Sequence, residues 1–296
     1  MRSDRPHSWL RHARVRKVFA GSVLVAFGVV SAVVQFFSQL FPAAFRHPGL
    51  VTAGSLGLCL AWGLARARPQ GGVRQEFGRP GMTVVVEEGD LFDQPGHLVV
   101  GFTDTFDTLV DDGSVINDGS VQGQLLARRY GGDAAVLDAE LAAALDGVAP
   151  VARESAQDKP RGKRDRYPIG TVAVLGARPR LVFAVAYSRM GNDCVASCGV
   201  QDLWLGLDRL WDAIRRHGQL ERVTMPLTGA GLARLHDLDE DSLLRLILLS
   251  FVVHAWERPL CRELRVVIRP GEMGRIDLPE TAAFLAGLAA GARRQI

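Results

Sequence analysis

Four short stretches of this 296-residue chain place polar residues or glycines directly after apolar runs or at the start of a helical pattern. Asp90 follows one apolar run, Thr103-Asp104-Thr105 follows another, and Ser120-Val121-Gln122-Gly123 leads into a helical pattern. Thr228-Gly229-Ala230-Gly231-Leu232 follows a third apolar run. Glycine-containing turns expose successive backbone N–H groups that bind anions, and a helix N-terminus adds partial positive charge. A carboxylate can accept hydrogen bonds from the amino group of a base. The combination predicts a site for a nucleotide diphosphate, although each loop by itself is also typical of an ordinary tight turn.

Other phosphate-binding patterns are absent from the sequence. The chain has neither the glycine-lysine signature of a P-loop nor the glycine fingerprint of a dinucleotide-binding Rossmann domain. Side chains that could supply acid–base chemistry do occur, but nothing in the sequence fixes their mutual geometry. These candidate side chains are Asp104, Asp107, Asn192, Asp193 and His236. The alternative for each is a structural role in a turn or a helix cap.

Apolar runs alternate with helical patterns from residue 83 onward. The sequence predicts strands at 83–87, 97–102, 171–175, 180–187, 222–226 and 263–269, and helices at 120–130, 136–145, 202–217, 239–256 and 279–293. This alternation predicts an α/β domain with helices on both faces of a mixed sheet. Ligands of such sheets bind at the carboxyl ends of the strands, which is where the polar loops fall.

The first 65 residues have a different composition. Residues 18–37 are uncharged and long enough to cross a hydrocarbon core of about 30 Å, and a second apolar segment follows at about 48–66. Basic residues cluster in the arm 1–17 and recur after the second segment, so the positive-inside rule places both ends in the cytoplasm. We expect a transmembrane hairpin, a linker at 66–80 and a globular domain at 81–296. A cleaved signal peptide is the alternative for the first segment.

Charge and cysteine content exclude several partners. A formal net charge of +3 gives little reason to expect nucleic-acid binding, and no aromatic residue interrupts the basic segment 159–166. We interpret that segment as an exposed loop, with a lid over a phosphate as the alternative. The spacing of Cys59, Cys194, Cys198 and Cys261 predicts no metal site, only thiols in a reducing compartment.

The ordered set of loops resembles the macro domain, an ADP-ribose-binding fold, over roughly residues 82–269. More closely, the chain resembles the macro-like domain of ThsA-like Thoeris antiviral defence effectors, a variant of which also carries two N-terminal transmembrane helices. The motifs that carry this resemblance are GDLFD, GFTDTFDT, QGQLLARRYGGD, YPIGTVAVL, AYSRMGND and MPLTGAGLAR. It implies a three-layer α/β/α macro-domain-like fold behind a two-helix transmembrane hairpin.

The resemblance also implies roles for the loop residues. Asp90 matches the aspartate that reads the adenine amino group, and Leu91 lies beside it. Residues 120–123 match the first phosphate loop and residues 228–232 match the second. Residues 103–105 occupy the segment in which many hydrolytic macro domains carry an Asn-Ala-Ala-Asn run, and this chain has no such asparagines.

These matches imply a receptor and effector in preference to an enzyme. The signal would be derived from ADP-ribose, with histidine-ADP-ribose as one candidate, and would be made by a TIR-domain protein that consumes NAD. Its binding would drive homo-oligomerisation, disruption of the bacterial cell membrane and abortive infection. The alternatives are a membrane-anchored ADP-ribosyl hydrolase and a tether that recruits ADP-ribosylated proteins.

Overall fold

The computed structural model of the chain describes residues 13–40, 48–67, 71–78, 81–110, 115–229 and 238–292. It divides into two compact units, Met1–Gln70 and Gly71–Ile296. Each unit is described below by itself.

The first unit is a pair of helices packed against each other, α1 (Ala13–Leu40) and α2 (Pro48–Ala67). Within the described residues, the segment Ala20–Phe37 of α1 is long and apolar enough to cross a membrane, and the apolar part of α2 is shorter, Val51–Gly63. Large apolar side chains on both helices are exposed, among them Leu24 and Trp62. The first predicted span therefore has the length and composition that crossing a membrane requires, whereas the apolar part of the second is shorter.

The second unit is built on one mixed sheet, in the strand order β1-β2-β10-β9-β3-β7-β6. The five strands from β2 to β7 in this order run parallel, and the edge strands β1 and β6 run antiparallel to their neighbours. The short strand β8 pairs with β7, and β4 and β5 form a separate hairpin. The bounds are β1 Gly72–Phe77, β2 Met82–Glu88, β3 His97–Thr103, β4 Ala152–Arg153, β5 Asp165–Arg166, β6 Val172–Leu175, β7 Val182–Met190, β8 Ala196–Ser197, β9 Val223–Pro226 and β10 Glu263–Ile268.

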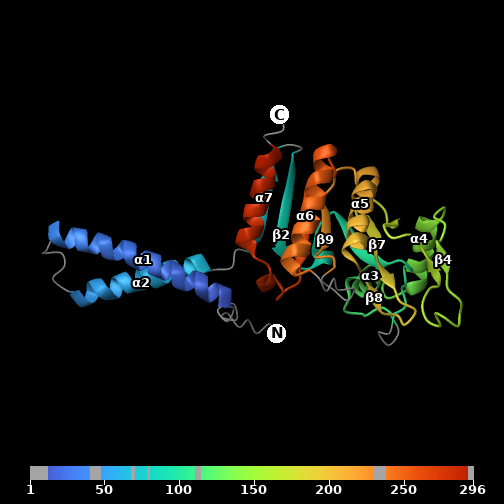
Figure 1. Ribbon diagram of the computed structural model, residues 1–296, viewed down its shortest axis with the longest axis horizontal. Coiled ribbons are helices and arrows are strands. Elements are labelled where there is room, and N and C mark those ends of the chain that lie inside the picture. The colour runs from blue at the N-terminus through green and yellow to red at the C-terminus, as the bar shows by residue number, and fades with distance from the viewer. Residues whose placement is uncertain are drawn as a thin grey trace. The chain divides into compact units, whose positions relative to one another are not determined.

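Helices cover both faces of this sheet, as the sequence predicts. One core cluster joins the sheet to three helices that lie next to one another in Figure 1, and a second joins the other face to two. The first three are α5 (Val200–His217), α6 (Glu240–Glu257) and α7 (Leu278–Ala292), and the other two are α3 (Val121–Arg129) and α4 (Ala134–Leu145). Two single-turn 3₁₀ helices complete the unit, η3 (Leu91–Asp93) and η4 (Met273–Arg275).

Central strands are apolar throughout because both of their faces are covered. In β3, Val99 packs into the cluster beneath α5 and α6, while Leu98, Val100 and Phe102 face α3 and α4. All four are essentially inaccessible to solvent. Fully burying such a side chain contributes roughly 1.5–3 kcal/mol, so a strand of this kind fixes the centre of the sheet.

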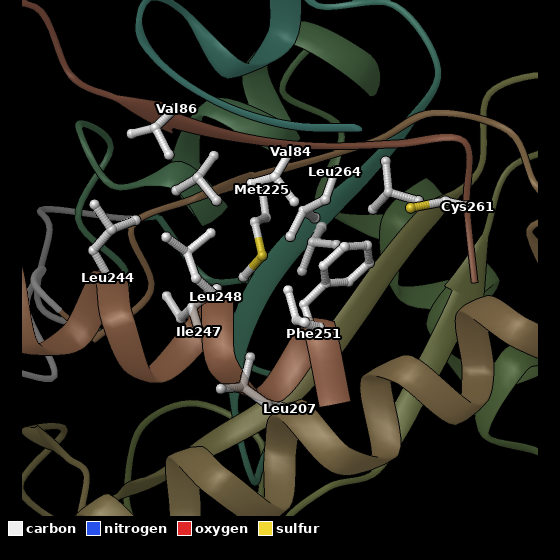
Figure 2. Packing of buried hydrophobic residues seen from close by; sticks show 14 of the residues in the cluster. Val84, Val86, Leu207, Met225, Leu244, Ile247, Leu248, Phe251, Cys261 and Leu264 are labelled. Carbon is white, nitrogen blue, oxygen red and sulfur yellow. The ribbon is translucent and has the colours of Figure 1, made fainter. Parts of the chain in front are cut away.

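Helix α6 shows how an apolar run can belong to a soluble core. Asp239 caps its first turn by accepting a hydrogen bond from the backbone N–H of Ser242, at 2.8 Å. Its buried face carries Leu244, Ile247, Leu248 and Phe251, which Figure 2 shows against side chains of β2, β9 and β10. The sequence-based interpretation of 239–256 as a buried domain helix is confirmed.

The fold corrects one sequence-based expectation and adds one element that the sequence did not predict. The segment 66–80 is not a linker throughout, because Gly72–Phe77 form β1, which pairs with β2 over its whole length. The β4–β5 hairpin was not predicted, since each of its strands has two residues and no apolar pattern. The four cysteines are free thiols, as expected.

Candidate functional site

Parallel pairing brings three of the predicted loops to one edge of the sheet. Strands β2, β9 and β3 run in the same direction, so their carboxyl ends share an edge. Asp90 follows β2, Thr103–Thr105 close β3, and Thr228 and Gly229 follow β9. Ala230, Gly231, Leu232 and His236 lie outside the described residues.

Asp90 begins η3 and forms one corner of this edge. Its Oδ1 accepts the backbone N–H of Phe92 at 2.8 Å, and its Oδ2 accepts Nη1 of Arg128 at 2.6 Å. The other terminal nitrogen of Arg128 donates to Asp93 at 2.7 Å, and its guanidinium lies over the Phe92 ring, 5.1 Å from the centroid. The side chains of Asp90 and Arg128 keep 39% and 38% of their surface exposed, so a ligand can reach this corner.

The surroundings of Asp90 favour its charged form. Partial burial opposes ionisation, but the hydrogen bond and charge of Arg128 and the backbone N–H of Phe92 outweigh it, so the pKa of Asp90 is lowered. The same pairing raises the pKa of Arg128. The pair therefore stays ionised near neutral pH, and Asp90 acts there as a hydrogen-bond acceptor only. Leu91 next to it is buried in the core, which leaves its backbone as the part that can face a ligand.

The predicted first phosphate loop is the N-terminus of α3. The Oγ of Ser120 accepts the N–H of Gly123 at 3.0 Å and donates to the carbonyl of Asn117 at 2.6 Å. A Cβ at Gly123 would lie 2.5 Å from the Asn117 carbonyl oxygen, so only glycine fits against that turn. The amides of Val121 and Gln122 belong to the same first turn, where the helix dipole favours an anion.

Gln122 supports this turn from inside. Its side-chain amide is buried and donates to the backbone carbonyl of Asp107. The start of α3 is thereby tied to the loop that follows β3. The side chain of Gln122 thus has a supporting contact, whereas the sequence pattern had suggested a ligand contact.

The loop that follows β3 is closed on itself by buried polar groups. Thr105 donates its hydroxyl to Asp107 Oδ2 at 2.5 Å, so its oxygen accepts from the Thr103 hydroxyl at 3.2 Å. Phe106, between Thr105 and Asp107, has a φ of +48°, a backbone conformation that non-glycine residues seldom adopt. Its ring is held in the core against Phe102. The hydroxyls of Thr103 and Thr105 therefore have hydrogen-bond partners inside the protein.

A buried lysine corrects the expectation that segment 159–166 is an exposed loop. The Lys159 side chain has no accessible surface, and its Nζ lies 3.2 Å from Asp107 Oδ2, 3.0 Å from the Arg161 carbonyl and 2.7 Å from the Lys163 carbonyl. Asp107 also accepts the backbone N–H of Lys163. The buried charges are thus paired and fully hydrogen-bonded, which makes their burial tolerable.

A second ion pair, largely buried, fixes the same loop. Arg166 Nη1 donates to Asp104 Oδ2 at 2.9 Å and to the Met190 carbonyl at 2.7 Å. Its remaining nitrogens donate to Glu154 and to Asn192, and the Arg166 hydrogen bond lowers the pKa of Glu154. Asp104 Oδ1 accepts the backbone N–H of Met190 at 2.8 Å. The β4–β5 hairpin is therefore held to the loop after β3 by two of its basic residues, Lys159 and Arg166.

Tyr187 lies beside the start of the predicted second phosphate loop. Burial raises the pKa of its phenol, and the nearby backbone N–H of Gly229 partly offsets that rise. Tyr187 is also the residue at which the β3–β7 pairing shifts register, a β-bulge that turns its side chain toward the loop. A Cβ at Gly101 would lie 2.2 Å from the Tyr187 ring, so the ring lies across that glycine. Gly229 has a φ of +93°, a conformation that glycine adopts readily.

The residues that could supply acid–base chemistry serve structural roles where they are described. Asp104 and Asp107 are held by buried cations, and Asn192 accepts from Arg166. Asp193 Oδ1 accepts the N–H of Val195 at 3.1 Å in a turn. Within the described part of the chain, no cluster of His, Cys, Asp or Glu side chains could hold a metal ion.

Three supporting residues were missed by sequence reasoning. Arg128, Lys159 and Tyr187 contact the predicted loops from a helix, a hairpin and a strand that are distant along the chain. Lys159 lies in a run of basic residues, and such a run predicts a solvent-exposed segment. The one signal in the sequence was Gly101 inside an apolar strand, which often marks the close approach of another group.

Comparison with known proteins identifies the family. A family model described as the macro domain of the Thoeris protein ThsA matches residues 84–269. No curated protein sequence matches the chain significantly. Among solved structures, a mutant macrodomain of Oceanobacillus iheyensis is 11% identical and superimposes with a TM-score of 0.46, covering 76% of this chain and 99% of its own.

Two further solved structures are similar at the same low level. The O. iheyensis macrodomain with ADP is 12% identical with a TM-score of 0.44, covering 76% of this chain and 98% of its own. A mutant tomato leucine aminopeptidase is 13% identical with a TM-score of 0.41, covering 74% of this chain and 38% of its own.

Proposed function

Since the chain belongs to the family of the Thoeris ThsA macro domain, we propose that it is an antiviral receptor that binds an ADP-ribose derivative. The observation that carries the proposal is the shared sheet edge. Three separate stretches of sequence contribute to it. They supply an ionised, accessible carboxylate at Asp90, a capped helix N-terminus at Ser120 and a glycine at positive φ, Gly229. Asp90 would accept the adenine amino group, and the amides at Ser120–Gly123 and Thr228–Leu232 would hold the diphosphate.

We propose further that the receptor is also the effector. The first unit would anchor the protein in the bacterial cell membrane as a two-span hairpin with both termini in the cytoplasm. The signal, for which histidine-ADP-ribose is our candidate, would be made by a TIR-domain protein that consumes NAD. Ligand binding would favour a homo-oligomer whose hairpins breach the membrane and abort the infection. Only a ligand that binds the assembled state better than the resting state can drive this change.

A receptor accounts for the site better than a hydrolase does. Asp104 and Asp107 belong to the loop after β3, in which many hydrolytic macro domains carry asparagines, and each is paired with a buried or largely buried cation. A general base must be free to accept a proton from water in reach of the bond that is cleaved. Asp104 and Asp107 are buried and paired with cations, so neither has the exposure that this role needs.

The test uses the full chain in detergent micelles and in liposomes. ADP-ribose, histidine-ADP-ribose and a cyclic ADP-ribose isomer are titrated by calorimetry, particle size is followed by light scattering, and dye release reports permeability. We expect one of the three to bind, to enlarge the particle and to release dye. Saturating ligand that changes neither particle size nor permeability would contradict the effector, and release of ADP-ribose from a modified protein would establish a hydrolase instead.

A matched pair of variants ties the response to the site. Asp90→Asn removes the carboxylate at the sheet edge, and Asp212→Asn removes one on α5. Both carboxylates are paired with an arginine and both are 39% exposed. We expect Asp90→Asn to weaken binding by roughly tenfold or more, since hydrogen bonds to charged groups contribute about 1.5–3 kcal/mol. Asp212→Asn should bind as the unsubstituted chain does.

A further inference from the structure

Arg128 is the residue in closest polar contact with the proposed adenine-reading carboxylate. It projects from the last turn of α3, while Asp90 and Asp93 flank η3, some 35 residues earlier in the chain. Its two terminal nitrogens contact different carboxylates, at 2.6 and 2.7 Å, and its plane lies over Phe92. Three contacts from one short segment thus fix a side chain that would otherwise be mobile.

The Asp90 carboxylate is held in one orientation by donors on both of its oxygens. Phe92 N–H holds Oδ1 and Arg128 holds Oδ2. The η3 backbone beneath it is fixed in turn by Arg180, whose Nη2 donates to the Phe92 carbonyl and, at 2.9 Å, to the Gln94 carbonyl. Each carboxylate oxygen can accept a further hydrogen bond, so Asp90 is oriented without being saturated.

Arg128 also sets the charge of this corner. Asp90, Asp93 and Arg128 together carry one net negative charge, and without the arginine the corner would carry two. A nucleotide diphosphate is itself an anion and would be repelled more strongly by the larger charge. Orientation and charge therefore act in the same direction, and loss of Arg128 should weaken the binding of such a ligand.

We propose that Arg128 is a positioning residue that aims the Asp90 carboxylate at the 6-amino group of the bound purine and so sets the preference for adenine. This inference rests on the proposed function. Replacing adenine by hypoxanthine puts a carbonyl oxygen where the amino group was, and that oxygen would face the fixed carboxylate. A site built to pair a donor rejects the analogue that lacks it. A carboxylate free to rotate away would discriminate less.

The experiment separates orientation from charge by using two nucleotides. ADP-ribose and its hypoxanthine counterpart, inosine diphosphate ribose, are titrated into the full chain in detergent by calorimetry. Charge repulsion acts on both nucleotides equally, because they carry the same diphosphate, so only a change in orientation alters the ratio of their affinities. The variants are Arg128→Ala, Arg128→Lys and the neighbouring Arg129→Ala, whose side chain donates to the Arg180 carbonyl at 3.2 Å and contacts neither aspartate in the described structure.

We expect Arg128→Ala to weaken ADP-ribose binding by roughly tenfold and to reduce the adenine preference by a similar factor. Arg128→Lys should restore part of the affinity but less of the preference, because an ammonium lacks the planar fork that contacts both aspartates. Arg129→Ala removes the same charge one residue away and should leave the preference unchanged. Thermal unfolding of each variant establishes that it is folded.

Three results would overturn the inference. Equal weakening of both nucleotides by Arg128→Ala would reduce the role of the arginine to charge. Tighter ADP-ribose binding by that variant would make Arg128 an obstruction on Asp90 and not a support. If Arg128→Ala leaves the affinity for each nucleotide unchanged, Asp90 reads the base unaided. Binding of neither nucleotide by the unsubstituted chain would instead defeat the proposed function, and this inference with it.

Discussion

Two aspartate–cation pairs lie in loops at the same edge of the sheet and differ in almost every physical respect. Asp107 and Lys159 have no accessible surface, and each has further hydrogen bonds inside the protein. Asp90 and Arg128 are each more than a third exposed, and Asp90 has acceptor capacity to spare. The sequence patterns around the two aspartates are similar, since each follows an apolar strand and a short polar turn.

The difference separates a supporting loop from a loop that can bind. Burial makes the Asp107 network a fixed frame, joining the loop after β3, the start of α3 and the β4–β5 hairpin. Exposure leaves the Asp90 corner able to exchange water for a ligand. A carboxylate at the end of a strand is therefore a binding group only when its neighbours leave it both ionised and reachable.

The largest effect is expected where the buried pair is broken. Asp107→Ala leaves the Lys159 ammonium buried without its carboxylate, and removal of one partner of a buried pair typically costs about 3–5 kcal/mol. Arg128→Ala breaks the exposed pair, for which the usual cost is about 0–1 kcal/mol. Denaturant unfolding of the full chain in detergent, followed by tryptophan fluorescence, measures both changes.

The double variant Asp107→Ala with Lys159→Met provides the control for this comparison. It removes both charges and leaves none unpaired, so its loss of stability should be smaller than that of Asp107→Ala alone. A double variant as unstable as the single one would show that the hydrogen bonds of Asp107, and not the buried charge, hold the frame. Equal losses for Asp107→Ala and Arg128→Ala would remove the distinction between the two loops.

A smaller effect is expected where the frame meets the second phosphate loop. Tyr187→Phe keeps the ring that lies across Gly101 but removes the phenolic oxygen near the Gly229 N–H. A polar contact of this kind contributes about 1 kcal/mol at most, so we expect up to roughly fivefold weaker ADP-ribose binding with little change in thermal stability. Calorimetric titration measures the affinity.

Tyr130→Phe is the matched control, because it also removes one phenolic hydroxyl. That hydroxyl donates to Glu140 of α4. Its ADP-ribose affinity should equal that of the unsubstituted chain. If both tyrosine variants lost affinity equally, the loss would come from general loosening of the domain, and Gly229 would not be held by Tyr187 in any way that binding requires.

Local patterns made much of the fold predictable. Leu203, Leu207, Leu210 and Trp211 recur on one face of α5 and are all buried, and the cap at Asp239 begins α6 as expected. Strand ends in a parallel sheet share an edge, so the approximate place of Asp90 and Gly229 followed from topology. Such features depend on residues that are neighbours along the chain.

The contacts that distinguish the two loops depend on residues far apart in sequence. Lys159 reaches Asp107 across 52 residues and Arg166 reaches Asp104 across 62. Nothing in a run of basic residues indicates which one is buried, because the pairing is decided by the tertiary fold. β1 was not predicted for a related reason. Half of its residues are polar, so its sequence shows no strand pattern, and the strand forms because it pairs with β2.

The smallest effect concerns the pH dependence of the exposed pair. The pKa of Asp90 is lower in the folded protein than its ordinary value of 3.8, so this pair adds stability above that value. The contribution is lost as the pH falls through the folded pKa, because protonation then removes the charge that Arg128 faces. Screening by solvent keeps it at about 0–1 kcal/mol or less for a pair this exposed. We expect the difference in unfolding free energy between the unsubstituted chain and Arg128→Ala to be present at pH 7 and to disappear once the pH falls below the lowered pKa of Asp90. Arg129→Ala, measured over the same range, should show no such trend.

A difference that persisted at low pH would come from the packing of Arg128 on Phe92, and the exposed pair would then differ from the buried one in packing more than in charge.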